Sequence, residues 1–190
     1  MSTRAILSID LQNDYFAGGK WPLSGIDAAA LNAAAVIGRA RTTGERVIHI
    51  RHEFAGPDAP FFLAGSDGAA IHPSVAPRPG ETVIVKHHAN SFRDTGLKEV
   101  LDRAGITDLI IVGAMSHMCV EAAARAAVDL GYRTTGVHDA AATRDLTCGE
   151  TLVPAALVHA AAMAALGFAY AALASTAEIL ARWEAPDDRG

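Results

Sequence analysis

Three side chains of the kinds that cleave amide bonds each stand at the end of an apolar run in this 190-residue sequence. Asp10 follows "RAILSI", Lys86 ends "ETVIVK", and Cys119 follows "LIIVGA" through the short segment "MSHM". Amide cleavage by a cysteine needs a thiolate that attacks the carbonyl carbon, a group that moves protons and a positive charge that stabilises anions. Cys119, Asp10 and Lys86 could fill these three roles if the fold brings them together.

The charge on the sulfur is the central expectation for such a site. A free cysteine has a pKa near 8.5, so it is mostly protonated at neutral pH, and only the thiolate attacks. We expect the start of a helix and the Lys86 ammonium group to lower the pKa of Cys119 until its sulfur is negative at physiological pH. Asp10 would carry the proton, and the first backbone N–H groups of the helix would bind the oxyanion.

Each of these three residues also has a plain structural interpretation. A single cysteine is more often a small buried hydrophobe, so Cys119 could be part of the core. Asp10 could cap the turn that follows it, and Lys86 could extend its ammonium group to water. Taken singly, these interpretations are favoured. A shared edge of one parallel sheet favours a site instead.

The alternation of elements along the chain predicts that shared edge. Short apolar runs alternate with helical patterns, which is typical of a parallel sheet covered on both faces. We therefore predict an α/β protein with a three-layer Rossmann-like fold and about six parallel strands. In such sheets, ligands bind beyond the carboxyl ends of the strands. The expected strands are 4–9, 46–51, 81–86, 109–114, 133–138 and 168–175, and the expected helices are 27–41, 94–105, 118–131, 153–167 and 175–184.

Caps and boundaries complete this prediction. Asp27 and Asp94 stand where helix N-caps are expected, and Gly105, Gly131 and Gly167 stand where helices should stop. The long connection 53–80 has the Pro and Gly content of a loop, and loops of this length are often functional. We predict a single domain over residues 1–184 and a short flexible tail over 185–190.

The composition of the chain limits which binding partners and which cellular compartment we expect. The net charge is −5 and the basic residues are scattered, which argues against nucleic acid and membrane surfaces as partners. Residues 151–177 lack charged side chains, but they are mostly alanine and indicate a buried helix and strand rather than a membrane span. Two cysteines without a CxxC motif, and no signal peptide, are typical of a cytoplasmic protein. The Ala-rich helix 153–167 suggests a homo-oligomer.

Three blocks of sequence resemble the signature segments of the isochorismatase-like cysteine hydrolase family, which includes N-carbamoylsarcosine amidohydrolases and nicotinamidases. The blocks are "ILSIDLQNDYF", "VIVKHHANSFRDTGL" and "VGAMSHMCVEAAARAAVDLGY". The resemblance covers roughly residues 4–180. It implies a triad of Asp10, Lys86 and Cys119 on a Rossmann-like fold. It also implies a cis peptide bond between Ala114 and Met115, with the N–H groups of Met115 and Cys119 directed at the oxyanion.

Departures from that family pattern limit the chemistry. Metal-containing nicotinamidases carry an Asp-x-His motif where this chain has "HIRHEF", so Arg51 and Glu53 replace the acid and the first histidine. We interpret His52 as a pocket or loop residue and His72 as a loop residue, and we expect neither a metal nor a cofactor. Isochorismatases proper generally lack the nucleophilic cysteine. Cys119 therefore favours hydrolysis of a C–N bond.

The substrate pocket is harder to predict than the triad. By resemblance and position, its candidate residues are Phe16, Trp21, Phe61, Phe62, Phe92 and His117, although ordinary packing would explain at least half of the aromatic residues. Cys148 lies in a polar segment without a nearby cation, so we expect no catalytic role for it.

The favoured hypothesis is a metal-independent hydrolase that cleaves a small amide or ureido compound through a thioester on the cysteine. One alternative is isochorismatase-type vinyl-ether hydrolysis that relies mainly on Asp10. A second alternative is a non-catalytic binding module that has kept the fold. The sequence does not identify the substrate, because the triad sets the reaction class while the pocket sets the substrate.

Overall fold

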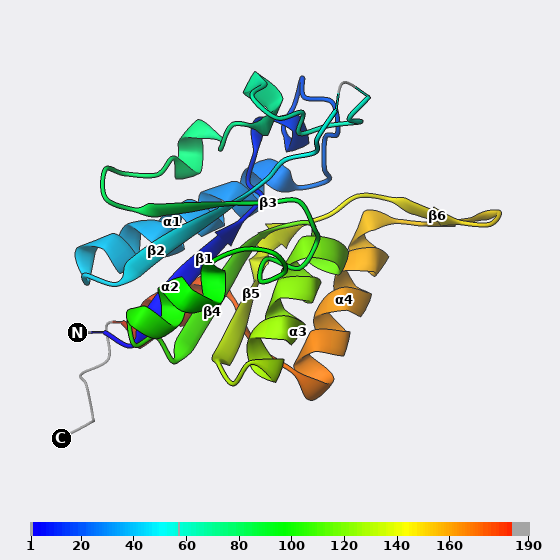
Figure 1. Cartoon of the computed structure of the whole chain (residues 1–190). Coiled ribbons are helices and arrows are strands. Elements are labelled where there is room, and N and C mark those ends of the chain that lie inside the picture. Colours follow the sequence, from blue (N-terminus) through cyan, green and yellow to red (C-terminus); the bar gives the residue numbers. More distant parts are fainter. Residues whose placement is uncertain (1, 57, 184–190) are drawn as a thin grey trace.

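Six parallel strands form the central sheet of the computed structural model, which describes residues 2–56 and 58–183 (Figure 1). Their order across the sheet is β3-β2-β1-β4-β5-β8, so the chain builds one half outward from β1 and then crosses over to build the other half. The strands are β1 (Arg4–Ile9), β2 (Arg46–His52), β3 (Thr82–Lys86), β4 (Asp108–Ala114), β5 (Arg133–Ala142) and β8 (Ala172–Ala174).

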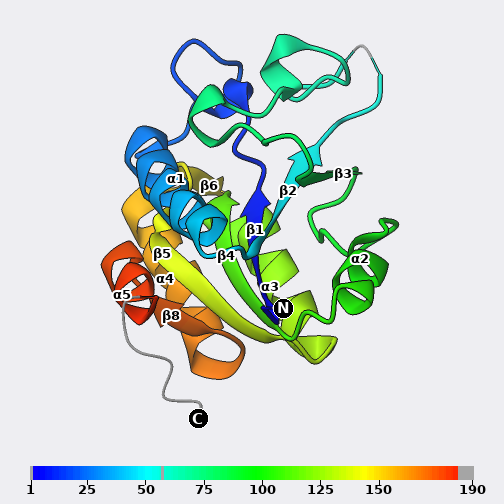
Figure 2. The same ribbon diagram turned by 90° about the vertical axis from the view of Figure 1, so that its left-hand side faces the viewer.

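Helices cover both faces of this sheet (Figure 2). On β1, Ile6 packs into the hydrophobic cluster beneath α1 and α5, whereas Leu7 and Ile9 pack into the cluster beneath α2, α3 and α4. Successive side chains of a strand point to opposite faces, so an uninterrupted apolar strand fits a sheet that is buried on both sides. The three-layer prediction is confirmed. The helices are α1 (Ile26–Thr42), α2 (Leu97–Arg103), α3 (Glu121–Asp129), α4 (Ala155–Ala169) and α5 (Thr176–Arg182).

Several predicted boundaries are wrong. Helix α4 continues through Gly167 to Ala169, so the last strand is much shorter than the predicted 168–175. A Cβ atom at Gly167 would come within 3.1 Å of the Leu173 side chain, which indicates that this glycine serves close packing of the helix on β8 rather than helix termination. The caps of α1 and α2 are Gly25 and Gly96, not Asp27 and Asp94.

A β-hairpin follows β5 that the sequence did not reveal. Strands β6 (Leu146–Cys148) and β7 (Thr151–Val153) pair in antiparallel fashion and project from the body of the molecule (Figure 1). Cys148 lies exposed on this hairpin. On the neighbouring helix α4, Leu157 is 61% exposed and Phe168 is 92% exposed. Self-association stays a prediction.

The long connection 53–80 is fixed to the segment that follows β1. The Asp14 carboxylate accepts hydrogen bonds from the backbone N–H of Phe62 (2.6 Å) and of Lys20 (3.1 Å). Gly68 packs so closely against this carboxylate that a Cβ atom there would overlap it. The connection contains two short 3-10 helices, η2 (Asp67–Ala69) and η3 (Pro73–Val75). It therefore forms a firmly attached wall above the carboxyl ends of β1 and β2.

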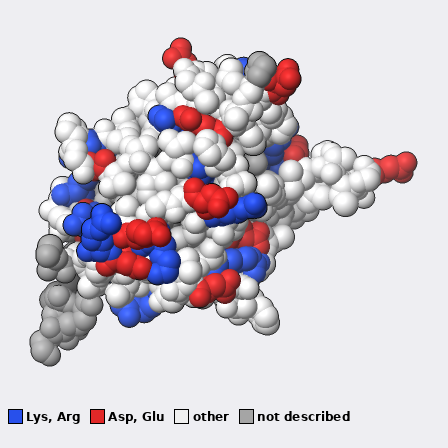
Figure 3. Space-filling view, viewed as in Figure 1, with Lys and Arg blue, Asp and Glu red and all other residues white. Residues whose placement is uncertain are grey.

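Charged side chains of both signs are interspersed over the face shown in Figure 3, and the projecting hairpin is mostly uncharged apart from its tip. None of the helices in the described residues combines the length and the hydropathy that crossing a lipid bilayer requires. The predicted tail 185–190 lies outside the described residues.

One glycine is required where β4 approaches β1. Gly113 has a φ of 135°, and a Cβ atom there would overlap the backbone oxygen of Ile9. We expect Gly113→Ala to lower the free energy of unfolding by about 3 kcal/mol, because backbone strain and overpacking add. Denaturant unfolding measures this effect.

Gly38 provides the matched control. It lies within α1, and a Cβ atom there would meet no heavy atom of the described chain within 4 Å. Gly38→Ala should raise the free energy of unfolding by roughly 0.5–1 kcal/mol, because alanine is the better helix former. Equal effects of the two substitutions would mean that the close approach of Gly113 to Ile9 does not constrain the fold.

Candidate active site

The three candidate catalytic side chains come together at the carboxyl edge of the sheet. Asp10 follows β1, Lys86 ends β3 and Cys119 follows β4. The chain reverses its direction of winding between β1 and β4, and this switch point is where open α/β sheets bind ligands. The predicted convergence is therefore present in the fold.

Asp10 and Lys86 form a buried ion pair. Lys86 Nζ lies 2.7 Å from Asp10 Oδ2, and both side chains are 0% exposed. The backbone of Asp10 has a φ of 51°, an uncommon conformation, and its N–H donates to the Ile50 carbonyl of β2. Backbone geometry as well as charge thus fixes the carboxylate.

Lys86 distributes its hydrogen bonds over three acceptors. In addition to Asp10 Oδ2, it contacts His52 Nδ1 at 2.9 Å and donates to the backbone carbonyl of His88 at 3.1 Å. Burial alone would lower the pKa of Lys86, but the nearby negative charge of Asp10 raises it above its ordinary value. Lys86 is therefore an ammonium group held in one position, and its N–H groups are used within the protein.

The second carboxylate oxygen of Asp10 has a different role. Oδ1 is buried and has no hydrogen-bond partner among the described residues, while Oδ2 is occupied by Lys86. Burial raises the pKa of Asp10, although the Lys86 ammonium group acts in the opposite direction. A carboxylate with a raised pKa and a free lone pair is a stronger base than an exposed aspartate.

Cys119 lies beside this carboxylate in the first helical turn after β4. The π-helix η4 (Ser116–Val120) precedes α3, and Cys119 is 6% exposed. Its sulfur, a carboxylate oxygen of Asp10 and a ring nitrogen of His52 all lie within 4.8 Å of one another. The sulfur is thus within reach of the base.

The expected charge on the sulfur is wrong. Burial and the negative charge of Asp10 raise the pKa of the Cys119 thiol well above its ordinary range, and the opposing effect of Lys86 does not compensate for them. The prediction rested on Lys86 and the helix start, and it left out the burial of the sulfur and the charge of Asp10. In the resting site, Cys119 is a neutral thiol beside a carboxylate.

The peptide bond between Ala114 and Met115 is cis, as the resemblance implied. The N–H groups of Met118 and Val120 both donate to the Met115 carbonyl, which closes a tight turn around the segment. The assignment of Met115 and Cys119 N–H groups to an oxyanion stays a prediction.

His52, interpreted from the sequence as a pocket or loop residue, contacts the Lys86 ammonium group directly. Burial and the neighbouring positive charge of Lys86 lower the pKa of His52 to about 3, so its ring is neutral near pH 7. Gln12 holds the backbone of His52 from both sides, accepting from its N–H and donating to its carbonyl at 2.8 Å each. The parallel register that sets His52 opposite Lys86 depends on strand pairing, which no local sequence pattern encodes.

The group Asp10, His52 and Cys119 offers one possible donor set for a metal ion. Carboxylate, imidazole and thiolate are ordinary ligands of zinc. The Lys86 ammonium group, however, contacts both Asp10 Oδ2 and His52 Nδ1. A cation would have to displace or deprotonate Lys86, so the site as built fits a proton-transfer centre better than a metal centre.

The predicted pocket residues do not form one group. Trp21 stacks on Phe61 at 4.9 Å, and Phe61 contacts Phe62 at 4.9 Å. This aromatic cluster reaches the catalytic centre, because His52 lies 6.3 Å from Phe62 between ring centroids. Phe16 stacks instead on His72 at 3.6 Å.

The two remaining pocket candidates, Phe92 and His117, have other partners. Phe92 stacks on Tyr132 at 6.0 Å and packs with the helices on the other face of the sheet. His117 is bonded through its Nδ1 atom to the Thr143 hydroxyl group at 2.7 Å. Roles for these two residues in binding substrate stay predictions.

The neutral state of His52 can be tested by pH. An unfolded histidine takes up a proton near pH 6.5, whereas His52 in the folded chain does so only near pH 3. Folding stability should therefore fall as the pH drops through this interval, by about 2 kcal/mol at pH 5 from this group alone. His52→Gln should reduce the loss of stability between pH 7 and pH 5 by that amount in urea unfolding. A His52 ring that titrates near pH 6.5 in NMR spectra would contradict the assignment.

Comparison with known proteins agrees with this geometry. A model of the isochorismatase domain matches residues 4–178. The uncharacterized isochorismatase family protein YddQ of Bacillus subtilis is 46% identical over 94% of this chain and 99% of its own length. A crystal structure from Oleispira antarctica, described as an isochorismatase hydrolase, has a TM-score of 0.92 and 56% identity over 95% of this chain and 99% of that one.

Two relatives carry names of specific activities. Streptothricin hydrolase of Streptomyces noursei is 37% identical over 86% of this chain and 59% of its own length. Maleamate amidohydrolase of Pseudomonas putida is 30% identical over 74% of this chain and 72% of its own length. The domain match, the relatives and the shared fold lead to one conclusion: this chain belongs to the isochorismatase family of hydrolases.

Proposed function

We propose that this hydrolase cleaves the C–N bond of a small amide or ureido compound through a thioester on Cys119. The observation that carries the proposal is that the two carboxylate oxygens of Asp10 differ in their hydrogen-bond partners. Oδ2 is bound by Lys86, while Oδ1 is buried and has no hydrogen-bond partner among the described residues. Since a carboxylate oxygen of Asp10 also lies within 4.8 Å of the Cys119 sulfur, Asp10 is arranged to accept the proton of the thiol.

In the first half of the reaction, the Cys119 sulfur attacks the substrate carbonyl carbon while its proton passes to Asp10 Oδ1. A C–S bond forms and the carbonyl oxygen becomes an oxyanion, which the N–H groups of Met115 and Cys119 stabilise. When the oxyanion collapses, the C–N bond breaks and Asp10 delivers the proton to the departing nitrogen. Ammonia or an amine leaves, and the acyl group remains on sulfur as a thioester.

In the second half, Asp10 removes a proton from water as the water oxygen attacks the thioester carbonyl. The C–S bond breaks, the acid product leaves and the proton returns from Asp10 to sulfur. Lys86 keeps its charge through both halves. It holds Asp10 in place and stabilises the anionic form of the carboxylate whenever the proton is elsewhere.

The names of two relatives support this class of reaction. Maleamate amidohydrolase is by its name an enzyme that hydrolyses an amide, and streptothricin hydrolase is by its name a hydrolase of streptothricin. Cys119 argues against vinyl-ether cleavage as the main activity, because that reaction has no need of a thiol. The aromatic cluster of Trp21, Phe61 and Phe62 provides an apolar wall near His52, which suits a small substrate with a compact acyl group.

Substitution of the two cysteines tests the proposal. We expect Cys119→Ala to lower kcat by on the order of 10³-fold or more, because no thioester can form. Cys148→Ala is the matched control, since Cys148 is exposed on the hairpin and should leave kcat unchanged. The assay measures ammonia or amine release from simple amides, carbamoyl amino acids and ureido compounds.

Mass spectrometry of the quenched reaction adds a direct readout. With a substrate that turns over, the wild-type chain should gain the mass of the acyl group on the peptide that contains Cys119. Hydrolysis that survives Cys119→Ala would contradict the proposal and favour vinyl-ether or Asp10-only chemistry. A chain that releases nothing from any of these compounds would favour a binding module.

A further inference from the structure

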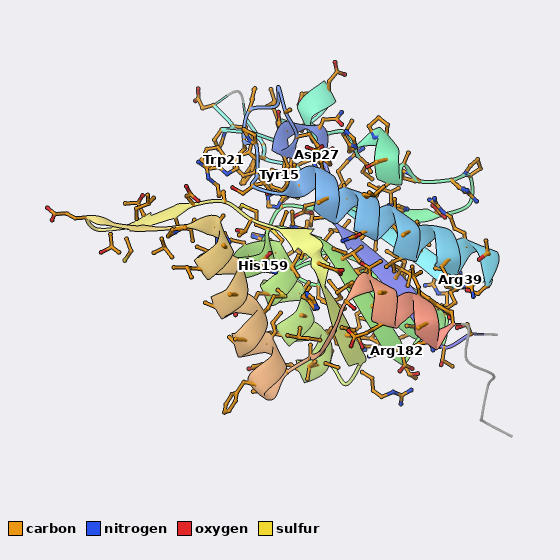
Figure 4. All side chains as sticks on the ribbon, turned by 180° about the vertical axis from the view of Figure 1, so that it is seen from behind. Tyr15, Trp21, Asp27, Arg39, His159 and Arg182 are labelled. Carbon is orange, nitrogen blue, oxygen red and sulfur yellow. The ribbon has the colours of Figure 1, made fainter. Side chains whose placement is uncertain are left out.

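His159 is the only polar side chain in the sequence of helix α4, "AALVHAAAMAALGFA". It belongs to the face of the helix that carries the buried residues Ala155, Val158, Ala162 and Met163, and it is itself half-buried. Figure 4 shows it on the side of α4 next to the central sheet. The mechanism proposed above makes no use of it.

The imidazole of His159 contacts the segment that carries the nucleophile. Its Nδ1 atom lies 2.8 Å from the hydroxyl oxygen of Ser116, and that hydroxyl group also lies 3.1 Å from the Ala142 carbonyl at the end of β5. Ser116 is 0% exposed and opens the π-helix η4, three residues before Cys119. The contact therefore joins α4, β5 and the nucleophile segment.

Counting protons fixes the direction of these bonds. The Ser116 hydroxyl group has one hydrogen, and the Ala142 carbonyl can only accept. Both contacts are hydrogen bonds when Ser116 donates to Ala142 and His159 Nδ1–H donates to Ser116. Burial lowers the pKa of His159, and the nearby His138 adds to this effect, which is consistent with a neutral ring that carries its hydrogen on Nδ1.

The same segment is bonded to β5 at two further points. Ala114 pairs with Ala142 across the β4–β5 ladder. His117 is bonded to the hydroxyl group of Thr143, the residue after Ala142. Bonds to β5 and to the residue that follows it hold the segment along one side, and the hydrogen bond of His159 ties it to α4.

We propose that His159 is a positioning residue, which holds the segment 115–119 in its reactive geometry through its hydrogen bond to Ser116. The turnover part of this inference rests on the proposed amide hydrolysis at Cys119. Displacement of a reacting group by about 1 Å can lower a rate by roughly 10²-fold, so a remote contact of this kind has a measurable effect on kcat.

Four variants test the assignment: His159→Phe, His159→Asn, Ser116→Ala, and the double variant of His159→Phe with Ser116→Ala. His159→Phe should lower kcat by roughly 10- to 100-fold with KM changed less than about twofold, because the substrate contacts remain. Asparagine places an amide N–H near the position of Nδ1 and should restore most of the loss. The double variant should be no worse than the worse single variant, because both single changes break the same bond.

His138→Phe is the control: it removes the imidazole near His159 but keeps the hydrogen bond between His159 and Ser116, and it should leave kcat unchanged. Hydrogen exchange of the peptide spanning residues 113–120 gives a readout that needs no substrate. Exchange in that peptide should increase in His159→Phe, remain as in the wild type in His159→Asn, and stay unchanged elsewhere in the chain for both.

The results separate the two proposals. If the wild-type chain hydrolyses no amide, the proposed function fails, and the exchange data still decide the role of His159. His159→Asn as impaired as His159→Phe would overturn the positioning role. Additive effects in the double variant would also overturn it. So would hydrogen exchange at 113–120 that is the same in both His159 variants as in the wild type.

Discussion

The buried ion pair between Asp10 and Lys86 is the interaction on which the rest of the site depends. Removal of two charges from water costs several kcal/mol per ion, and the pair persists only if good hydrogen bonds offset that cost. Lys86 satisfies the condition with Asp10, the neutral ring of His52 and the carbonyl of His88. Asp10 follows β1, His52 ends β2 and His88 follows β3, so the order and register of the sheet build the pair.

The pair also determines how Cys119 can react. Burial raises the pKa of the Cys119 thiol, and the negative charge of Asp10 acts in the same direction. In the proposed reaction, proton transfer to Asp10 therefore accompanies the attack of the sulfur on carbon. A resting thiol also reacts more slowly with oxidants and alkylating agents than a resting thiolate does. The arrangement thus links nucleophile activation to the presence of substrate.

The sequence predicted the sheet and the convergence of Asp10, Lys86 and Cys119, because apolar runs mark parallel strands and functional residues follow their carboxyl ends. It did not predict what depends on distances between segments. The pKa of Cys119 follows from its burial and from Asp10, and the contact of His52 with Lys86 follows from strand register. The predicted end of α4 at Gly167 was wrong, because this glycine permits close packing and does not end the helix.

The ultraviolet absorbance of the thiolate measures the central claim most directly. The chain should carry Cys148→Ala, so that Cys119 is the one remaining thiol, with the double alanine variant as the blank. The account predicts no thiolate absorbance from Cys119 as the pH of the substrate-free protein is raised from mildly acidic to mildly alkaline. A thiolate band already present at neutral pH would contradict it, because Cys119 would then be ionised before any substrate binds.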